Sequence, residues 1–346
     1  MTASTLSIVG AALCRDFGSP AFRRGVKSLL QLGLCISSGL ATSAPIHAAA
    51  SAKPDWNIVD HIPLEKVIIQ GHRGVGNLAE ENTVEAFELA WKMGIYPEAD
   101  LRMTKDGVIV PFHDNTFARV VKDASPELKK LGVKDLTSAE LAQLDVGSWK
   151  GEQFKGRRVI PMATIFDKMR GRPERHLYMD IKSIDFPLLA AEVRKYGIEK
   201  QIVLASRKVA ELREWKALVP ESETLLWMHG NEAGLNADLV EHRKTKFAGI
   251  TQLQVHVYYK ESKDAWAPPT DASPANNPFR LRNDFLVAIG KELRTHGIVF
   301  QTFPYTDDPN VYAKLLDLGV MSFATDHPDI TLREIKAYYA ARKARR

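Results

Sequence analysis

The strongest constraint on the fold is a regular alternation of two patterns that begins near residue 66. Short apolar runs typical of strands are separated by longer stretches with the spacing of amphipathic helices. The helical stretches 84–94, 187–197 and 309–319 each end at a glycine, a common helix stop. The β-like runs are VIIQG (67–71), the two arms of PEADLRMTKDGVIVPFHD (97–114), HLYMDIK (176–182), QIVLA (201–205), ETLLWM (223–228), FAGITQL (247–253), IVFQTF (298–303) and MSFAT (321–325). Strands that alternate with helices predict a parallel sheet with right-handed crossovers.

These nine runs favour an α/β barrel, with one run more than eight strands require. Residues 97–114 are expected to form a hairpin, because Asp106-Gly107 is a strong turn signal. A hairpin has no room for the crossover helix that parallel neighbours need, so the barrel should be irregular there. Two long irregular segments, 115–135 and 257–280, would frame a site at the carboxyl ends of the strands, and the second has the composition of a surface insertion.

The first 50 residues have the features of a targeting leader. A basic stretch with Arg23 and Arg24 precedes a modest apolar stretch and then small residues suited to cleavage. Residues 1–50 are therefore interpreted as a signal peptide, which predicts an exported, periplasmic or secreted protein; a disordered leader is the alternative. The remainder, 51–346, is long enough for one large barrel or two smaller domains, and the strand pattern favours a single barrel.

Cysteine and charge content exclude several kinds of function. Both cysteines, Cys14 and Cys35, lie inside the leader, so the rest of the chain has no residue for disulfides or cysteine catalysis. The formal net charge of +5 falls to about +2 without the leader's four bases and one acid, which gives no support for nucleic-acid binding. No later run approaches the ~20 apolar residues of a membrane span, so no stable span is expected after the leader.

Residues suited to acid/base and phosphate chemistry lie at the ends of the predicted strands. His72 and Arg73 follow the first run; a histidine moves protons near neutral pH, and an arginine binds phosphate. His113 ends the second arm of the hairpin, and a structural role is the alternative for both histidines. Glu81 and Asn82 precede the first helical stretch, where helix capping is the alternative to a role in a site.

Three carboxylates are placed where they could share a cation. Glu98 and Asp100 are two residues apart on one strand, so both side chains point the same way. Like charges this close oppose each other's ionisation unless a cation lies between them, and Mg²⁺ or Ca²⁺ takes such oxygen ligands. Asp180 and Lys182 repeat the spacing at the end of a later strand. The alternatives are an exposed strand face paired with Arg102, and a surface ion pair at Asp180 and Lys182.

A barrel would bring these strand ends together. Acidic ligands for a metal ion, basic side chains for phosphate oxygens and two histidines for proton transfer are what phosphodiester cleavage requires. The sequence lacks a GxSxG turn, a Walker A loop, an HExxH motif and a GxGxxG loop between a strand and a helix.

The order of these motifs closely resembles the glycerophosphodiester phosphodiesterase family. The resemblance rests on GHRGVGNLAEENT, PEADLRMTKDG, VIVPFHD, DLTSAELAQLDVGSW (135–149), IPMATIFDKM (160–169) and LGVMSFATDHPD (318–329), and it covers about residues 66–335. It implies a TIM barrel, a divalent cation, usually Mg²⁺ or Ca²⁺, and hydrolysis of a small-molecule glycerophosphodiester to sn-glycerol 3-phosphate and an alcohol.

Matched motif by motif, the resemblance assigns acid/base roles to His72 and His113, phosphate binding to Arg73 and Lys182, metal binding to Glu98, Asp100 and Asp180, and supporting roles to Glu81 and Asn82. The chain also departs from the family pattern. Asp180 replaces the usual Glu, residues 118–132 replace a Gly-rich turn after His-Asp, and Phe303 and Thr306 stand where Trp and Asn are usual. These departures leave the leaving-group alcohol open.

Two rival functions remain. A phospholipase D-like activity on lysophospholipids or sphingomyelin would need an apolar approach to the site, which Trp266, Pro268 and Pro269 in the insertion could supply. A non-catalytic binding barrel is the other rival, but a binding protein has no need of two histidines that transfer protons.

Overall fold

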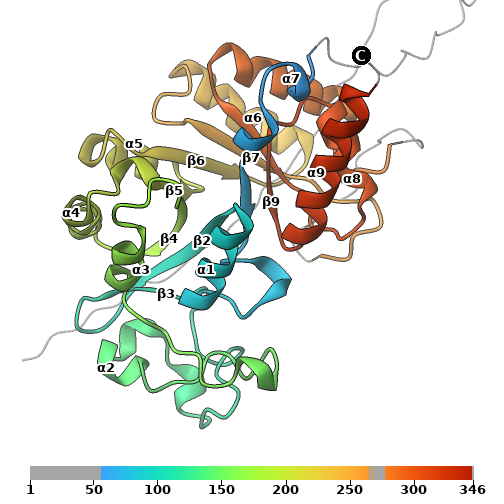
Figure 1. Ribbon diagram of the computed structural model, residues 1–346. Coiled ribbons are helices and arrows are strands. Elements are labelled where there is room, and N and C mark those ends of the chain that lie inside the picture. The colour runs from blue at the N-terminus through green and yellow to red at the C-terminus, as the bar shows by residue number, and fades with distance from the viewer. Residues whose placement is uncertain (1–55, 265–266, 268–276, 345–346) are drawn as a thin grey trace, which may run out of the picture. The chain divides into compact units, whose positions relative to one another are not determined.

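The computed structural model describes residues 56–264, 267 and 277–344, so the predicted signal peptide lies outside the described residues. Eight parallel strands close into a barrel, because β1 pairs with both β2 and β9 (Figure 1). In order around the barrel they are β1 (Ile69–Gly71), β2 (Tyr96–Met103), β4 (Leu177–Ser183), β5 (Ile202–Ser206), β6 (Glu223–Met228), β7 (Gln252–His256), β8 (Val299–Phe303) and β9 (Ser322–Thr325). The predicted TIM barrel is confirmed.

The ninth β-like run is the irregular one, as expected. Strand β3 (Ile109–Pro111) pairs antiparallel with β2 and stands outside the closed barrel. Gly107 makes the turn, with a φ of +81° and its N–H bonded to the Thr104 carbonyl at 3.0 Å. One predicted strand was placed too early. Residues 247–251 are not extended, since Phe247 and Gly249 have φ of +57° and +85°, and β7 begins only at Gln252.

Helices lie between consecutive barrel strands and cover the outside of the barrel (Figure 1). They are α1 (Val84–Met93), α2 (Ser138–Leu141), α3 (Met162–Met169), α4 (Phe186–Tyr196), α5 (Val209–Leu218), α6 (Glu232–Lys244), α7 (Asn283–Thr295), α8 (Asn310–Asp317) and α9 (Pro328–Lys343). Short 3-10 helices are Ile58–Asp60, Leu64–Lys66, Gly76–Leu78, Leu128–Lys130, Val133–Asp135, Glu152–Phe154 and Glu199–Gln201. None of the described helices has the length and apolar character needed to cross a membrane.

The caps of α1 show why the sequence forms a helix there. The Thr83 side chain accepts the N–H of Ala86, and Gly94 ends the helix with a left-handed φ of +75°. The apolar face buries Phe87 and Ala90 completely against the barrel. Burial of an aromatic or branched side chain of this size stabilises the fold by roughly 1.5–3 kcal/mol. Thr83 is therefore the N-cap of this helix.

The interior of the barrel is polar along one path. The Tyr178 hydroxyl donates to Gln252 Oε1 at 2.6 Å and accepts from Gln301 Nε2 at 3.3 Å. Gln301 bonds in turn to Gln254, whose Oε1 lies 3.0 Å from the Nε2 atom of His256. Buried amides are costly unless paired, so this chain of contacts fixes where His256 lies at the floor of the cavity described below.

Residues 112–161, here called the outer segment, connect β3 to α3 and carry α2 (Figure 1). They have a small apolar core that is separate from the barrel core, and it includes Phe112, Phe117, Val120, Val133, Leu141, Val146 and Val159. The predicted irregular stretch 115–135 is thus the first half of a packed unit. The other predicted insertion, 257–280, follows β7 and its ends pair through Tyr259 and Phe279. Its Trp266, Pro268 and Pro269 lie outside the described residues.

Candidate active site

A cavity of about 590 Å³ lies where the barrel strands end. Its lining comprises Gln70, His72, Arg73, Gly76, Asn77, Glu81, Glu98, Asp100, His113, Arg119, Trp149, Lys150, Asp180, Lys182, Ala205, Leu225, Trp227, His229, Gln254, His256, Asp264, Phe303, Tyr305 and Asp326. The structure therefore brings together at one cavity all the sequence-predicted site residues except Asn82, which lies directly behind it.

An acidic cluster is formed by β2 and β4. Asp100 pairs directly with Asp180 across the two parallel strands, and Glu98 lies two residues earlier on the same face. One oxygen atom from each of the three carboxylates lies within 4.8 Å of the others. Glu98 and Asp100 are almost fully buried, so the alternative of an exposed strand face is wrong. The shorter Asp180 side chain still reaches the cluster.

Arg102 does not belong to this cluster. The register of β2 against β4 shifts between Leu101 and Arg102, which breaks the alternation of faces. The Arg102 guanidinium donates instead to the carbonyl oxygens of Phe112 and His113. The alternative in which Arg102 pairs with the two acids of β2 is thus also wrong.

The electrostatics of the acidic cluster fit a hard divalent cation. Lys182 Nζ lies 3.0 Å from Asp100 Oδ1 and 2.6 Å from Asp180 Oδ2, so one ammonium faces three carboxylates. Burial, together with the charges of Asp100 and Asp180, raises the pKa of Glu98 well above its usual range. Burial alone would also raise the pKa of Asp100, but Lys182, His113, Arg73 and the Asn82 amide together outweigh burial and lower that pKa. A second cation would relieve the remaining repulsion, and oxygen ligands suit Mg²⁺ or Ca²⁺.

Asn82 supports the cluster from behind. Its Nδ2 donates to Asp100 Oδ2 at 2.8 Å, and its Oδ1 accepts the Asp100 backbone N–H at 3.0 Å. Capping of α1 is left to Thr83. Asn82 therefore holds one predicted metal ligand in place through both atoms of its amide group.

Each of the two histidines is held by an aspartate through its Nδ1 atom. His72 Nδ1 lies 2.7 Å from Asp326 Oδ1, and His113 Nδ1 lies 2.7 Å from Asp114 Oδ1. Burial would raise the pKa of both aspartates, but the adjacent imidazoles lower it, together with Arg119 in the case of Asp114. In both pairs the carboxylate contacts Nδ1, so Nε2 is the ring nitrogen that does not face the aspartate.

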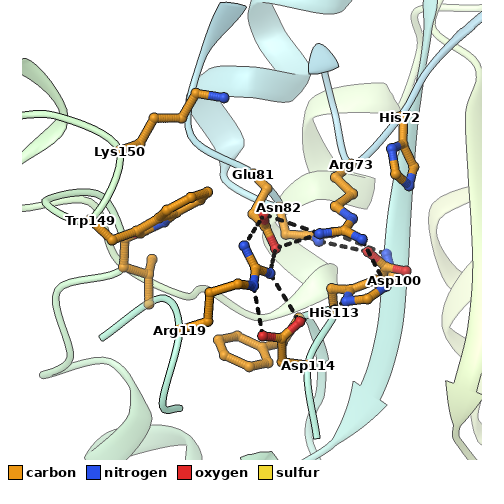
Figure 2. A network of polar contacts seen from close by, with 12 residues as sticks. His72, Arg73, Glu81, Asn82, Asp100, His113, Asp114, Arg119, Trp149 and Lys150 are labelled. Carbon is orange, nitrogen blue, oxygen red and sulfur yellow. Dashed lines mark hydrogen bonds and ion pairs between the residues drawn. The ribbon is translucent and has the colours of Figure 1, made fainter. Parts of the chain in front are cut away.

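Four charged side chains and His113 form a closed ring, here called the ion ring (Figure 2). Arg119 bonds Asp114 through Nε at 2.8 Å and Glu81 at 2.6 Å. Arg73 NH1 lies 3.3 Å from Glu81, and Arg73 NH2 lies 2.9 Å from His113 Nε2. A guanidinium has only donors, so the His113 Nε2 accepts this bond and its proton is on Nδ1, facing Asp114.

Aromatic side chains from β6, β7 and β8 line the opposite side of the cavity. Trp227 Nε1 lies 3.2 Å from Asp180 Oδ1, and the Trp227 ring stacks on His256 with ring centroids 5.2 Å apart. Burial and the neighbouring His229 lower the pKa of His256 to about 3, so this imidazole is neutral. Phe303 meets the His72 ring edge to face at 5.0 Å and stacks on Tyr305.

The backbone is left-handed at three non-glycine residues of this region. Arg73, Asn82 and Tyr305 have φ of +52°, +56° and +41°. At Arg73 this conformation points the backbone N–H at Glu98 Oε2, 2.6 Å away. Gly74 is required beside it, because its φ is +111° and a Cβ would lie 2.9 Å from that of Ala86.

Several residues of the site were not found from the sequence. Asp326 lies 254 positions from His72, and its only signal was a carboxylate just after the last β-like run. Trp227 and Arg119 gave no pattern of their own. Trp149 and Lys150 follow the DVGS turn, which was noted in the sequence but given no role. Thr306, expected in place of a family Asn, does not line the cavity.

A TIM barrel with three carboxylates that could hold a metal ion and two aspartate-held histidines around one cavity has the residues that a metal-dependent phosphoric diester hydrolase needs. The sequence model of the Glycerophosphoryl diester phosphodiesterase family matches residues 72–330. The chain belongs to this family, which confirms the resemblance and the prediction of an enzyme.

Known relatives agree with this assignment. The chain is 25% identical over 291 residues to a glycerophosphodiester phosphodiesterase of Bacillus subtilis, covering 79% of this chain and 88% of the relative. It is 31% identical over 163 residues to one from Caldanaerobacter subterraneus, covering 45% of this chain and 64% of the relative, which is less than two thirds of that protein. The fold is similar to an Oleispira antarctica phosphodiesterase solved with the product sn-glycerol-3-phosphate, with a TM-score of 0.56, 20% identity, and coverage of 78% and 96%.

Proposed function

We propose that this enzyme hydrolyses glycerophosphodiesters to sn-glycerol 3-phosphate and an alcohol. The observation that carries the proposal is the placement of two aspartate-held imidazoles on the same cavity as Arg73, Lys182 and the acidic cluster. Family membership supports the reaction, and the product bound in the Oleispira structure supports the glycerol phosphate half of the substrate.

His113 acts as the general base. In this structure the electron pair of its Nε2 atom accepts a hydrogen bond from the Arg73 guanidinium at 2.9 Å. When the substrate phosphate draws the Arg73 guanidinium toward its own oxygens, this electron pair can take the proton of the hydroxyl that attacks phosphorus. If that hydroxyl belongs to water, sn-glycerol 3-phosphate forms directly; if it belongs to the glycerol, a cyclic phosphate forms and water then opens it. Asp114, which faces Nδ1, stabilises the imidazolium that forms.

His72 acts as the general acid. As the bond between phosphorus and the alcohol oxygen breaks, the oxygen takes a proton from His72 Nε2, and the alcohol leaves neutral. Asp326 holds the other ring nitrogen and so fixes the orientation of the imidazole. Arg73 and Lys182 bind the phosphate oxygens, whose charge grows in the transition state.

Glu98, Asp100 and Asp180 would hold a divalent cation, Mg²⁺ or Ca²⁺. Such an ion supplies a positive charge that polarises the phosphate and offsets its developing negative charge. The chain's own part is to fix the three carboxylates, through the pairing of β2 with β4 and through Asn82.

One assay tests the proposal. The protein is incubated with glycerophosphocholine and with lysophosphatidylcholine, with added Mg²⁺ or Ca²⁺ or with a chelator, and glycerol 3-phosphate and choline are measured. We expect metal-dependent release of both products from glycerophosphocholine. If neither compound is turned over with metal present, the enzymatic proposal is wrong.

The cavity lining favours a small polar substrate over a lipid. Among the described residues that line it, most are charged or carry a hydrogen-bonding group. Turnover of lysophosphatidylcholine alone would favour the phospholipase D-like rival.

We further propose that the protein is exported, on the basis of the leader sequence alone. Expression of the full chain in a Gram-negative host, followed by fractionation and N-terminal sequencing, tests this. A mature protein that begins near residue 50 in the periplasm or medium is expected; an uncleaved cytoplasmic product would contradict it.

A further inference from the structure

The loop that ends the DVGSW motif is held rigidly in the outer segment. The Asp145 carboxylate accepts the backbone N–H groups of Gly147 at 2.9 Å, Ser148 at 3.0 Å and Gly156 at 2.7 Å. A Cβ at Gly147 would lie 1.9 Å from the Phe154 carbonyl oxygen, so only glycine fits there. Such a loop presents the two residues that follow it in one conformation.

Those two residues are Trp149 and Lys150, and both line the cavity that contains the two histidines. Figure 2 shows them on one side of Glu81, with Arg73 and His72 on the other side in this view. The Trp149 indole N–H is bonded to the Val146 carbonyl at 3.0 Å, which fixes the ring. This side of the cavity, defined by Trp149 and Lys150, is here called the outer corner.

The outer corner presents one cation to the cavity, the Lys150 ammonium. Lys150 Nζ donates to the Gly76 carbonyl at 3.3 Å, and within the described part of the chain no carboxylate lies within ion-pair distance of it. Burial lowers the Lys150 pKa, although nearby acids oppose this. Each of those acids already has a closer partner, namely Arg119 for Glu81 at 2.6 Å, Arg157 for Glu80 at 2.9 Å and His72 for Asp326 at 2.7 Å.

The Trp149 ring is also already associated with positive charge. Arg119 Cζ lies 5.0 Å and Lys150 Nζ 5.9 Å from the ring centroid. Tryptophan faces often bind quaternary ammonium groups, but here such a group would lie beside two cations. The outer corner is therefore unsuited to choline and suited to an anion.

Only one end of the substrate can carry that anion. The glycerol end of a glycerophosphodiester offers hydroxyl groups alone, whereas the alcohol end can carry a carboxylate or a phosphate. We propose that Lys150 and Trp149 receive the leaving alcohol and select one that bears an anionic group. This inference rests on the proposed function and names the alcohol that the function leaves open.

The test compares two diesters, glycerophosphoserine and glycerophosphocholine. The ratio of their kcat/KM values is measured for the wild type, Lys150→Gln and Lys150→Glu. We expect the wild type to prefer the serine diester, Lys150→Gln to lower the ratio about fivefold through KM, and Lys150→Glu to reverse the preference. Lys150→Arg should retain the wild-type ratio. A glycerophosphodiester with a phosphorylated alcohol should behave like the serine diester.

Lys155→Gln is the matched control, because Lys155 is an exposed lysine of the same segment paired only with Glu152. An unchanged ratio in both Lys150→Gln and Lys150→Glu, with melting temperatures near that of the wild type, would overturn the inference. If no diester is turned over at all, the proposed function fails separately. Binding of the two diesters to wild type and Lys150→Gln, measured by calorimetry, then decides the inference by itself.

Discussion

The two sides of the cavity are built in different ways. On the barrel side, the acidic residues lie on strands whose register is fixed by backbone pairing, as in the direct pairing of Asp100 with Asp180. On the outer side, Arg119, Trp149 and Lys150 lie on loops held by ion pairs, by side chains that accept backbone N–H groups and by a small core of their own. The acidic cluster is thus placed by paired strands, whereas the residues that we propose to contact the alcohol lie on loops, which can change without disturbing the barrel.

The largest effect is expected at the two histidines of the cavity, His72 directly after β1 and His113 at the start of the outer segment. His113→Ala and His72→Ala should each reduce kcat by about 10²–10⁴-fold, because each removes a proton-transfer group. The measurement is steady-state hydrolysis of glycerophosphocholine. His61→Ala is the control, since His61 stacks on Trp56 and does not line the cavity. Activity near the wild-type level in either variant would show that the role assigned to that histidine is wrong.

A second large effect is expected at the acidic cluster. Mg²⁺ or Ca²⁺ should raise the melting temperature of the wild type, since a ligand that binds only the folded state stabilises it. In Asp180→Asn the affinity for the ion should fall by at least about 10–100-fold, and chelator-sensitive activity should fall with it. Asp167→Asn, which changes an exposed acid paired with Arg170, should behave as the wild type. An equal metal-induced shift in all three proteins would argue against this site.

An intermediate effect is expected where the two sides meet, in the ion ring. Arg119→Met removes the bonds to Glu81 and Asp114 and should lower kcat roughly tenfold with little change in KM, because it loosens the groups that orient His113. Arg119→Lys should not restore activity, since one ammonium cannot bond two carboxylates in the same bidentate way. Exposed Arg158 of the same segment supplies the control, Arg158→Met. A purely structural role would lower the melting temperature and leave kcat intact.

The smallest effect is expected at the loop that supports the outer corner. Burial opposes ionisation of Asp145, but the N–H groups of Ser148, Gly156 and Gly147 outweigh it and lower its pKa. Asp145→Asn should cost about 1 kcal/mol of unfolding free energy at pH 7. Because the pKa is lowered in the folded state, this stabilisation is fully present when the pH is above the ordinary aspartate pKa of about 3.9. It is lost progressively as the pH falls from there through the folded-state pKa.

Urea unfolding of wild type and Asp145→Asn at pH 7 and pH 3 measures that difference. The difference in unfolding free energy between wild type and Asp145→Asn should be smaller at pH 3. At that pH the Asp145 carboxyl of the unfolded wild type is largely protonated, so unfolding takes up a proton and is favoured. A gap that widens toward low pH would contradict the assigned contacts.

The difference between the barrel side and the outer side of the cavity also explains which features could be predicted from the sequence. Strand alternation identified the barrel, and Glu98, Asp100 and Asp180 were found because two-residue spacing places side chains on one strand face. The direction of Arg102 could not be predicted, since a register shift is a property of two paired strands. The paired run 201–205 and its neighbours were placed to within a residue or two.

The sequence did not predict which residues from distant parts of the chain would contact the site residues. Nothing local in the sequence indicates that Asp326 would hold His72 or that Trp227 would bond Asp180. Arg119 lies in a stretch that departs from the family pattern, so the resemblance was silent about it. Its role comes from the outer segment folding back over Glu81, and a single sequence does not show this.

The left-handed backbone at Arg73, Asn82 and Tyr305 bears on how this enzyme could be engineered. Each such residue costs the folded state about 1–2 kcal/mol relative to an unstrained conformation. Glycine at these positions would relieve strain but remove the side chain that the site uses. Stabilising substitutions are therefore better placed on barrel helices that do not contribute to the cavity, because there they should not lower kcat.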